Sequence, residues 1–507
     1  MPDFNFQIPD GYDDIETLEK RLHFLSEYDW ILKGQKRALK LFYEMSNRVP
    51  AYKDFLKIHK VNPNKIKTIY DFALIPPLNK DNYLRKYPRE MLSWDGQFPR
   101  GQWVISSTSG STGQPFYFPR TNIQDRQYAI TAELYLRSNF EIDKKSTLYI
   151  DAFPMGAWIG GLFTYEAIKI IASQGPYSIS IITPGIHKLE VIKSVKQLGN
   201  NFDQIIIGAY PPFLKDILDD GIREGLDWEQ YNLGFIFSAE AFTEDFRDYV
   251  LRKIGSKDQF TTTLNHYGTV DIGTMAHETP ESIMIRRLLV DGNNLKAIFP
   301  ESIKQPTFAQ YNPEMFYFDS ENHNLFCTSY SGLPLVRYDL GDYGDILTHA
   351  EVRKALDKVG VPLDDKINYS GIKDKVINLP FIYVYERNDF SVSYYAFIIY
   401  PDMIRRPMQS LEAQKFLTGK FSMQVDYSKE GRQQLNINVE LRHGVGASKE
   451  IQDKLVDILH NSLIKESSEY REVTKMIGMD IQPMVHLWPY EEPKFFSPGT
   501  KQRWVIS

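Results

Sequence analysis

Short apolar runs alternate with longer amphipathic runs between residues 145 and 265, and this alternation constrains the fold more than any other feature of the chain. The apolar runs, each followed by a helical period, lie at 148–150, 179–182, 205–207 and 235–237, and the helical periods at 160–173, 187–198, 212–224 and 243–254. Strands that are apolar throughout are buried on both faces, which is typical of a parallel sheet covered by helices. We therefore predict an α/β fold whose ligands bind at the carboxyl ends of the strands.

The two flanks of this region have a different texture. Residues 15–49 carry leucines and other apolar residues at helical spacing, which predicts a helical N-terminal part over 1–100. After about residue 345 come a polar helical run, a short connector and a section rich in tyrosine and β-branched residues. Two strand candidates, 392–400 and 435–441, precede a helix at 448–466. We predict a large domain with parallel-rich sheets over 1–368 and a small α+β domain over 369–507.

Composition and charge exclude several classes of function. The 507 residues have a net charge of −6 and no block of Lys or Arg, which argues against nucleic acid or an anionic membrane surface as the main partner. The single cysteine, Cys327, excludes an intramolecular disulfide and any multi-cysteine metal site. No apolar run approaches the roughly 18 residues of a membrane span, and the start lacks a signal-peptide pattern. We expect a cytoplasmic protein.

A loop of hydroxyls and glycines follows the apolar residues Val104 and Ile105, and it comprises Thr108, Ser109, Gly110, Ser111, Thr112 and Gly113. Glycine lets backbone N–H groups converge on an anion, and short hydroxyls add donors, so such a loop can bind phosphates. The spacing matches neither a P-loop nor a dinucleotide-binding turn. Taken alone, the segment fits a flexible Ser/Gly linker equally well.

Four further motifs follow this loop in order along the chain. Residues 265–271 read Asn-His-Tyr-Gly-Thr-Val-Asp, and 335–342 place an Asp directly after a Gly at the end of a strand-like run. Residues 370–375 read Ser-Gly-Ile-Lys-Asp-Lys at the expected domain junction, and 497–503 read Ser-Pro-Gly-Thr-Lys-Gln-Arg near the C-terminus. His266 and His277 with Glu278 also suggest a metal, but no third and fourth ligand stands at a credible spacing, so we reject a structural zinc.

This ordered set resembles the adenylate-forming superfamily, and most closely its phenylacetate-coenzyme A ligase branch, which includes CapK-type and acyl-protein synthetase-like members. Residues 72–80, Phe-Ala-Leu-Ile-Pro-Pro-Leu-Asn-Lys, resemble an N-terminal segment of that branch, and 238–241, Ser-Ala-Glu-Ala, resemble its "GAE-P" turn. The likeness spans nearly the whole chain. It implies the α/β fold expected above, with a C-terminal domain that is mobile.

The resemblance also implies an activity. ATP and a carboxylic acid, aromatic acids among them, would form an acyl-adenylate and pyrophosphate, and the acyl group would pass to coenzyme A or to another thiol, amine or hydroxyl. ATP and Mg²⁺ would be the cofactors, with coenzyme A as one candidate. The implied partners are a small carboxylic acid and either a carrier protein or another acceptor. Because relatives include homodimers, the resemblance also makes a homodimer one possible state of this chain.

Carried onto this sequence, the family pattern implies the site residues. Lys501, Thr269 and Asp271 would be catalytic, with Lys501 against the α-phosphate and carboxylate, Thr269 on the α-phosphate and Asp271 on Mg²⁺. Asp342 would accept hydrogen bonds from the ribose. The remaining cofactor-binding residues implied are Thr108 to Gly113 on the phosphates, and Ala239, Glu240, His266, Tyr267, Gly268 and Lys373. The substrate pocket would include Phe153, Trp158 and Tyr210.

Three departures from the family pattern affect the second half-reaction. In the segment 370–380, Ile372 replaces an Arg, Lys375 replaces an acidic residue, and a Lys-x-x-Gly stretch is missing, which weakens the prediction of coenzyme A as the acceptor. Near the C-terminus Lys501 is displaced by one position from the family lysine, so Lys494 is the fallback. Asp271 stands where the family usually has a Glu.

Other interpretations stay open at this point. The chain could transfer AMP or an acyl group to a protein or a cofactor hydroxyl, or it could be a non-catalytic nucleotide-binding relative. Asp342 could belong to an ordinary turn, Lys501 could be a solvated terminal charge, and Tyr267 could be a core residue. Aromatic residues assigned to the acid pocket could simply pack in the core.

Overall fold

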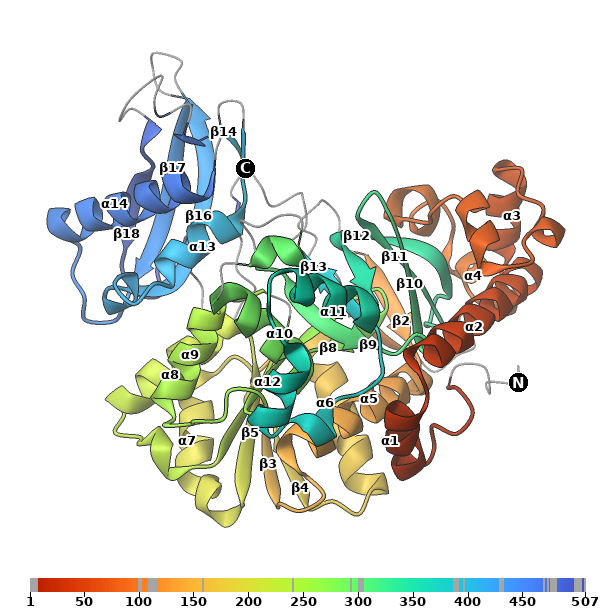
Figure 1. Ribbon diagram of the computed structural model, residues 1–507, viewed down its shortest axis with the longest axis horizontal. Coiled ribbons are helices and arrows are strands. Elements are labelled where there is room, and N and C mark those ends of the chain that lie inside the picture. The colour runs from red at the N-terminus through yellow and green to blue at the C-terminus, as the bar shows by residue number, and fades with distance from the viewer. Residues whose placement is uncertain are drawn as a thin grey trace.

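One sheet of eleven strands organises the larger part of the molecule, and a three-stranded sheet organises the smaller part (Figure 1). The computed structural model describes residues 8–98, 103–107, 116–156, 159–238, 241–291, 294–299, 305–385, 392–394, 397–427, 433–467, 470–471, 474, 481–496 and 504–505. In the large sheet the strand order is β10-β11-β12-β13-β9-β8-β7-β6-β5-β3-β4. The predicted α/β class is confirmed.

The N-terminal part is helical, as predicted. It comprises α1 (Ile15–Phe24), α2 (Glu27–Arg48), α3 (Pro50–Ile58) and the short α4 (Arg89–Leu92), with brief 3-10 turns between them. Ser26 and Asp29 form a capping box that begins α2. The buried face of α2, which carries Trp30, Phe42 and Met45, belongs to one core cluster with the strands β10 to β12. In Figure 1, α2 lies beside β10 and β11 at the edge of the large sheet, and α1 lies near α5.

The β-α alternation folds as the sequence predicts. The strands are β3 (Thr147–Asp151), β4 (Ile179–Ile182), β5 (Gln204–Ala209) and β6 (Leu233–Phe237), and β5 and β6 pair in parallel with their neighbours, as does β3 with β4. The helices are α5 (Asn122–Phe140), α6 (Ile159–Gln174), α7 (Lys188–Leu198), α8 (Pro211–Arg223) and α9 (Glu244–Lys253). One core cluster contains α5 and α6 and another contains α7, α8 and α9, so helices cover both faces of the sheet.

The rest of the large sheet begins with β7 (Thr263–Thr269), which pairs in parallel with β6. From β7 onward, neighbouring strands of the sheet are antiparallel. These strands are β8 (Gly273–His277), β9 (Thr307–Tyr311), β10 (Phe316–Glu321), β11 (Asn324–Ser329), β12 (Leu335–Leu347) and β13 (Phe381–Val384). Helix α10 (Pro280–Asp291) follows β8, and α11 (His349–Lys358) and α12 (Leu363–Ser370) lie between β12 and β13. A separate hairpin of β1 (Val104–Ser107) and β2 (Tyr117–Arg120) flanks the hydroxyl-glycine loop.

The small unit has its own core. It comprises the hairpin β14 (Val392–Tyr394) and β15 (Phe397–Ile399), helix α13 (Pro401–Met408), strands β16 (Leu417–Tyr427), β17 (Gln433–Leu441) and β18 (Met484–Trp488), and helix α14 (Lys449–Glu466). Strand β16 is antiparallel to β17, and β17 is parallel to β18. Its core cluster begins at Val392 and includes Trp504.

The expected boundary at residue 368 falls too early for this sheet. Strand β13 pairs with β12 and β9 of the large sheet, and Phe381 packs in a core cluster with Ile285 and Leu356 of the large unit. We therefore propose that the large domain extends to Tyr385 and that the small domain begins by Val392. Within the described residues, no helix is both long and apolar enough to cross a membrane.

Candidate active site

The turn between β7 and β8 lies at the carboxyl end of the last parallel strand. Thr269 pairs with Gly273 across this turn, and the register shifts between Tyr267 and Gly268. A Cβ on Gly268 would lie 2.5 Å from the Gly273 carbonyl oxygen, so only glycine allows this close approach. The turn thereby presents Thr269 and Asp271 at the edge of the sheet where ligands of such folds bind. Thr269 Oγ1 is buried and makes no hydrogen bond to any residue in the described part of the chain.

Asp271 is held by two groups from distant parts of the chain. Lys80 Nζ lies 3.1 Å from Asp271 Oδ2, and the Tyr338 hydroxyl donates a hydrogen bond to the same oxygen. The Asp271 side chain is 5% exposed and that of Lys80 is 27% exposed. Both of these contacts are to the same oxygen, Oδ2. Neither Lys80 nor Tyr338 was expected at the site from the sequence.

Backbone pairing explains how Lys80 reaches the site. Leu78 forms an isolated parallel bridge with Tyr338, through the bonds Leu78 N–H to Arg337 O (3.0 Å) and Asp339 N–H to Leu78 O (2.8 Å). The buried Arg337 guanidinium also donates to the carbonyl oxygens of Phe72 and Ile75. The N-terminal segment therefore lies along β12, and Lys80 follows two residues after the bridge. Its likeness to the family segment at 72–80 was the sequence signal for this placement.

Tyr267 and Asp342 meet as neighbours in the same site. The Tyr267 hydroxyl donates to Asp342 Oδ2 at 2.7 Å, which joins the end of β7 to β12. Asp342 follows Gly341, whose φ of 71° lies in the region that glycine adopts without strain. Tyr267 is 8% exposed, so it is largely a core residue whose hydroxyl reaches the site.

A buried charge cluster contacts the backbone of β7 next to the site. The Glu278 carboxylate accepts the Asn265 N–H of β7 at 2.9 Å and pairs with the guanidinium groups of Arg247 and Arg286. Arg247 also pairs with Glu244 at 2.8 Å, and its side chain is fully buried. Although burial alone would raise the pKa of Glu244, the guanidinium charges hold it below its usual value.

His266 is buried next to this site and stays neutral. Its ring lies 4.9 Å from the ring of Tyr135, and Nε2 has no hydrogen-bond partner among the described residues. Burial lowers the pKa of His266 to about 3, and the nearby His277 adds to the effect. His266 is therefore positioned as a neutral part of the core behind Tyr267, and no group of three or more metal-ligating side chains forms within the described ranges.

The residues assigned to the acid pocket meet at the next strand ends. The rings of Phe153 and Tyr210 are 5.5 Å apart, and Phe153 lies just after β3 while Tyr210 lies just after β5. A Cβ on Gly208 would lie 2.8 Å from the Phe153 ring, so glycine makes room for that ring. Asp151, at the end of β3, is fully buried, and burial raises the pKa of its carboxyl well above the usual range.

Several predicted residues lie outside the described residues. They are Thr108, Ser109, Gly110, Ser111, Thr112, Gly113, Trp158, Ala239, Glu240 and Lys501. Both flanks of the terminal stretch are described: Phe496 is 1% exposed and Trp504 is 4% exposed. The fallback Lys494 is exposed, and its ammonium lies 4.9 Å from the centre of the Phe495 ring.

Lys373, which the resemblance assigned to cofactor binding, lies away from the other described site residues. It is exposed in a 3-10 turn after α12, and its neighbours Ile372 and Lys375 line a cavity of about 330 Å³ together with Gln204 and Leu233. Those two residues begin β5 and β6. The segment therefore lies at the amino edge of the parallel strands, opposite the turn that carries Asp271, and Lys373 cannot serve a nucleotide bound there.

Two curated proteins are similar to this chain in sequence. Phenylacetate-coenzyme A ligase of Thermus thermophilus is 23% identical over 263 residues, 51% of this chain and 53% of that protein. The enzyme of the same name from Aromatoleum evansii is 26% identical over 219 residues, 43% of this chain and 46% of that protein. The match thus spans about half the length of these curated relatives. No protein-family model matches the chain.

Solved structures share the fold over nearly the whole chain. A structure of 2-hydroxyisobutyryl-CoA ligase in the postadenylation state with 2-HIB-AMP has a TM-score of 0.66 at 13% identity, covering 96% of this chain and 91% of that one. The chain therefore has the fold of this ligase. Both sequence relatives named above are phenylacetate-coenzyme A ligases. The same 2-hydroxyisobutyryl-CoA ligase in the thioesterification state, with 2-HIB-AMP and CoA, gives a TM-score of 0.54 at the same identity and coverage.

The last strand of the large sheet and the first strand of the small unit both lie after the junction expected at 370–375. The chain passes from the large sheet to the small unit between Tyr385 and Val392, not at 370–375. Residues 386–389 there read Glu-Arg-Asn-Asp, outside the described residues. Arg387 with Asp389 fits the family's Gly-Arg-acidic pattern better than Ile372 does. A search for an arginine followed by an acidic residue just after the last strand of the sheet would have found it.

Proposed function

We propose that this chain activates a carboxylic acid with ATP, forming an acyl-adenylate and releasing pyrophosphate, and then transfers the acyl group to coenzyme A or a related thiol. The observation that carries this proposal is the convergence of Thr269, Asp271, Lys80 and Asp342 at the carboxyl edge of the parallel strands. Three segments far apart in the sequence supply them. The names of the two sequence relatives and of the structural neighbour support the same reaction class.

Asp342 and Tyr267 would bind the nucleoside. A carboxylate accepts more than one hydrogen bond, so Asp342 can keep the Tyr267 hydroxyl on Oδ2 and accept from the ribose hydroxyls through Oδ1. The tyrosine then acts as a support that sets the carboxylate orientation. This arrangement fixes the adenosine end of ATP and leaves the phosphates to reach toward the turn after β7.

Thr269 and Lys80 would bind the phosphates. The Thr269 hydroxyl is a donor with no described partner, and the Lys80 ammonium carries a charge within 3.1 Å of Asp271. As charge builds on the α-phosphate during attack by the carboxylate, fixed donors stabilise it without having to reorganise. The hydroxyl-glycine loop from Thr108 to Gly113 and Lys501 are proposed to complete this set, with Lys501 contacting the α-phosphate and the acid.

The donor set at Asp271 fits Mg²⁺. Magnesium prefers oxygen ligands and is commonly held by one or two carboxylates together with substrate phosphates. Asp271 Oδ1 is such an oxygen, since Lys80 and Tyr338 both contact Oδ2. Bound there, the metal would neutralise phosphate charge. The chain's own contribution is to orient the carboxylate through Tyr338 and to balance its charge through Lys80.

Phe153 and Tyr210, together with Trp158, are proposed to line the acid pocket. The two described rings are 5.5 Å apart, and aromatic walls favour an apolar acid, including an aromatic one. Coenzyme A as acceptor is supported by the later hinge, because Arg387 and Asp389 remove the strongest departure from the family pattern. A carrier protein as acceptor, a homodimer and a cytoplasmic location stay predictions.

The test is pyrophosphate release with ATP and Mg²⁺ across a panel of aryl, fatty and amino acids, with and without coenzyme A. We expect acid-dependent release that rises with coenzyme A and falls by about a hundredfold or more in Asp342→Ala and Lys80→Met. Matched controls are Asp357→Ala on the exposed face of α11 and Lys53→Met on α3, both expected to keep wild-type rates. Wild-type rates in Asp342→Ala and Lys80→Met would remove the proposed site.

A further inference from the structure

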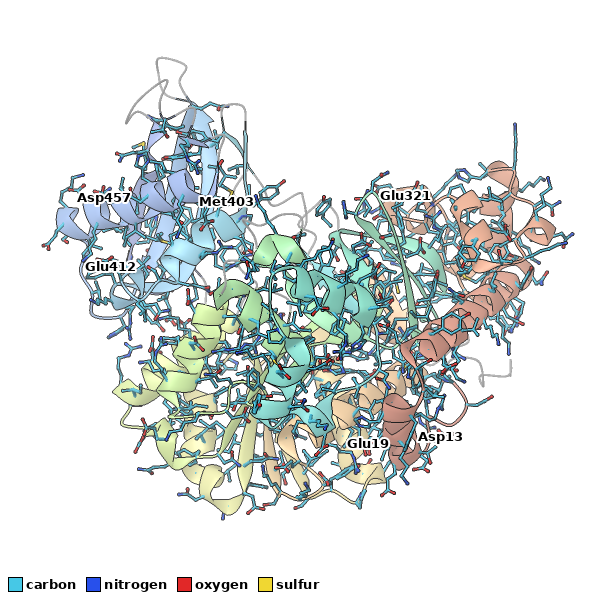
Figure 2. All side chains as sticks on the ribbon, viewed as in Figure 1. Asp13, Glu19, Glu321, Met403, Glu412 and Asp457 are labelled. Atoms are coloured by element: carbon cyan, nitrogen blue, oxygen red, sulfur yellow. The ribbon has the colours of Figure 1, made fainter. Side chains whose placement is uncertain are left out.

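The small unit packs on α8 of the large unit through charged side chains. Asp216, Asp219 and Asp220 stand three and four residues apart on α8, so their carboxylates share one face of that helix. Opposite them, Lys420 of β16 contacts Asp216, and Arg442, just after β17, lies 3.2 Å from Asp219. Figure 1 shows the small unit above α8 and α9, and Figure 2 labels Met403, Glu412 and Asp457 on the small unit.

Lys420 is the centre of this contact. Its ammonium contacts Asp216 of the large unit and lies 3.2 Å from Glu440 Oε2 of its own unit. The side chains of Lys420, Asp216 and Glu440 are 6%, 2% and 0% exposed. Burial alone would lower the pKa of Lys420, but the two carboxylates hold it above its usual value, so the ammonium stays charged. Across the part of the chain that the structure describes, Lys420 is the sole ion-pair partner of Asp216.

Two further contacts fix the direction of approach. Lys188 of α7 lies 2.8 Å from Asp220 and also contacts Glu491 after β18, next to Tyr490, whose hydroxyl lies 3.2 Å from Asp220. Thr243, which caps α9, donates to Gln409 at the end of α13 at 2.7 Å. The contacts thus involve residues of α7 and α8 and the N-cap of α9, and together they restrict rotation more than a single ion pair would.

The same strand that carries Lys420 holds the C-terminal tail. The Met423 N–H donates to the Trp504 carbonyl oxygen at 2.7 Å, and the Trp504 ring lies 4.6 Å from the ring of Phe421. The Arg405 guanidinium lies 4.5 Å from the centre of the Trp504 ring. Lys501 precedes Trp504 by three residues in the sequence. Strand β16 therefore contacts α8 of the large unit through Lys420 and contacts Trp504 through Met423. Trp504 is the described residue that follows Lys501 most closely in the sequence.

We propose that Lys420 is a positioning residue, whose ammonium, shared between Asp216 and Glu440, sets the orientation of the small unit on α8 and through β16 the place of the C-terminal tail. This inference deepens the proposed function, and only its catalytic readout rests on that function. Without the ammonium, the two buried carboxylates of Asp216 and Glu440 would lose the ion pair that they share. That arrangement is strongly unfavourable, and separating the two units relieves it by letting water reach both groups.

The first readout is a distance and needs no activity. Spin labels are attached to cysteines introduced at Lys193 on α7 and Asp457 on α14, both exposed, while the natural Cys327 is buried and does not react. Distance distributions are measured in the full chain, in Lys420→Met and in the control Lys449→Met. Lys449 is 78% exposed and pairs only with Asp453 of its own helix among the described residues. We expect Lys420→Met to broaden and shift the distribution and Lys449→Met to leave it unchanged.

The second readout is acid-dependent exchange of pyrophosphate into ATP by the same variants. We expect a loss of about tenfold or more in Lys420→Met, with partial recovery in Lys420→Arg because the charge returns. An unchanged distance distribution in Lys420→Met overturns the proposal, and so does a shift with unchanged exchange, since position would then not matter. If the distances shift but the wild type shows no exchange, the orientation stands and the proposed function fails.

Discussion

Two buried charge clusters of similar composition perform different tasks in this molecule. Arg247 and its partners Glu244 and Glu278 lie wholly within the large unit, under β7 and next to the candidate site. Lys420 and its partners Asp216 and Glu440 join the two units. In both clusters the side chains are nearly inaccessible to solvent. What differs is whether the two sides of the ion pair can move apart without unfolding.

This difference determines what each cluster controls. A charge inside one unit can reach water only if that unit unfolds, so the Arg247 cluster contributes to whether the sheet folds and keeps β7 in place. A charge at the contact between units can reach water when the units separate, so the Lys420 cluster controls an orientation. The following experiments separate the two roles, beginning with the largest expected effect.

Arg247→Met should destabilise the large unit by about 3–5 kcal/mol, because it leaves Glu244 and Glu278 buried with one counter-ion fewer. The measurement is the free energy of unfolding in denaturant. Arg126→Met, which removes a pair between side chains that are 47% and 73% exposed, is the control, with an expected change below about 1 kcal/mol. An equal loss of unfolding free energy in the two variants would show that burial does not make the Arg247 cluster more important for stability than an exposed ion pair.

Glu281→Gln should stabilise the chain by a few kcal/mol at pH 8 and by little at pH 5. Glu281 is fully buried, and neither carboxylate oxygen is hydrogen-bonded within the described ranges. Burial raises its pKa to about 8. Because the folded state holds the proton more tightly than the unfolded state, stability is full at low pH and falls as pH rises through this range.

The measurement for Glu281 is the free energy of unfolding as a function of pH, in the wild type and in Glu281→Gln. His349 Nδ1 lies 3.7 Å from Glu281, and burial lowers the pKa of His349 to about 4, so both groups are neutral between those two values. This contact is therefore a neutral pair and not a third charge cluster. A wild-type stability that is flat from pH 5 to pH 8 would show that Glu281 is charged and paired.

Lys420→Met and Asp216→Asn should be coupled by about 0.5–3 kcal/mol in the free energy of association of the two units. Each single change leaves a buried charge without its partner, whereas the double change removes both, so its effect should be smaller than the sum. The free energy of association is measured from the fraction of molecules at the wild-type spin-label distance. Strict additivity would mean that the two side chains do not act as a pair.

Lys449→Met should change the free energy of unfolding by less than about 0.5 kcal/mol. Lys449 Nζ lies 2.8 Å from Asp453 Oδ1, but both side chains are on an exposed helix face, where water and salt screen the attraction. The same denaturant measurement checks it. A loss above 1 kcal/mol would show that surface pairs on α14 stabilise the small unit and would remove this variant as a control.

Local pattern was sufficient for much of this fold. The apolar runs from 148 to 237 predicted β3 to β6 and the helices α6 to α9, since buried parallel strands need apolar residues on both faces. The motif at 265–271 was recognisable in the sequence, and the structure places it in β7 and the turn that follows. The place of Asp342 after a Gly in a strand-like run was likewise readable from local sequence.

Long-range pairing was not readable in the same way. Nothing in residues 370–385 indicates that β13 returns to the large sheet. The junction expected at 370–375 assigned Lys373 to the site, whereas its segment lies at the amino edge of the parallel strands. Lys80 stood in a recognised segment, yet its contact with Asp271 depends on a bridge between Leu78 and Tyr338. Their sequence separation leaves no periodic trace in either segment.

The order of residues thus specified which side chains carry the chemistry and which segments form strands and helices, because burial and backbone propensity act on neighbours in the chain. Only the folded molecule specifies which of these side chains meet, with Lys80 beside Asp271, Tyr267 beside Asp342 and Lys420 beside Asp216. Each of these contacts joins segments separated by many residues. Their geometry follows from how whole layers pack against one another, and packing depends on the complete set of surfaces and not on any single segment.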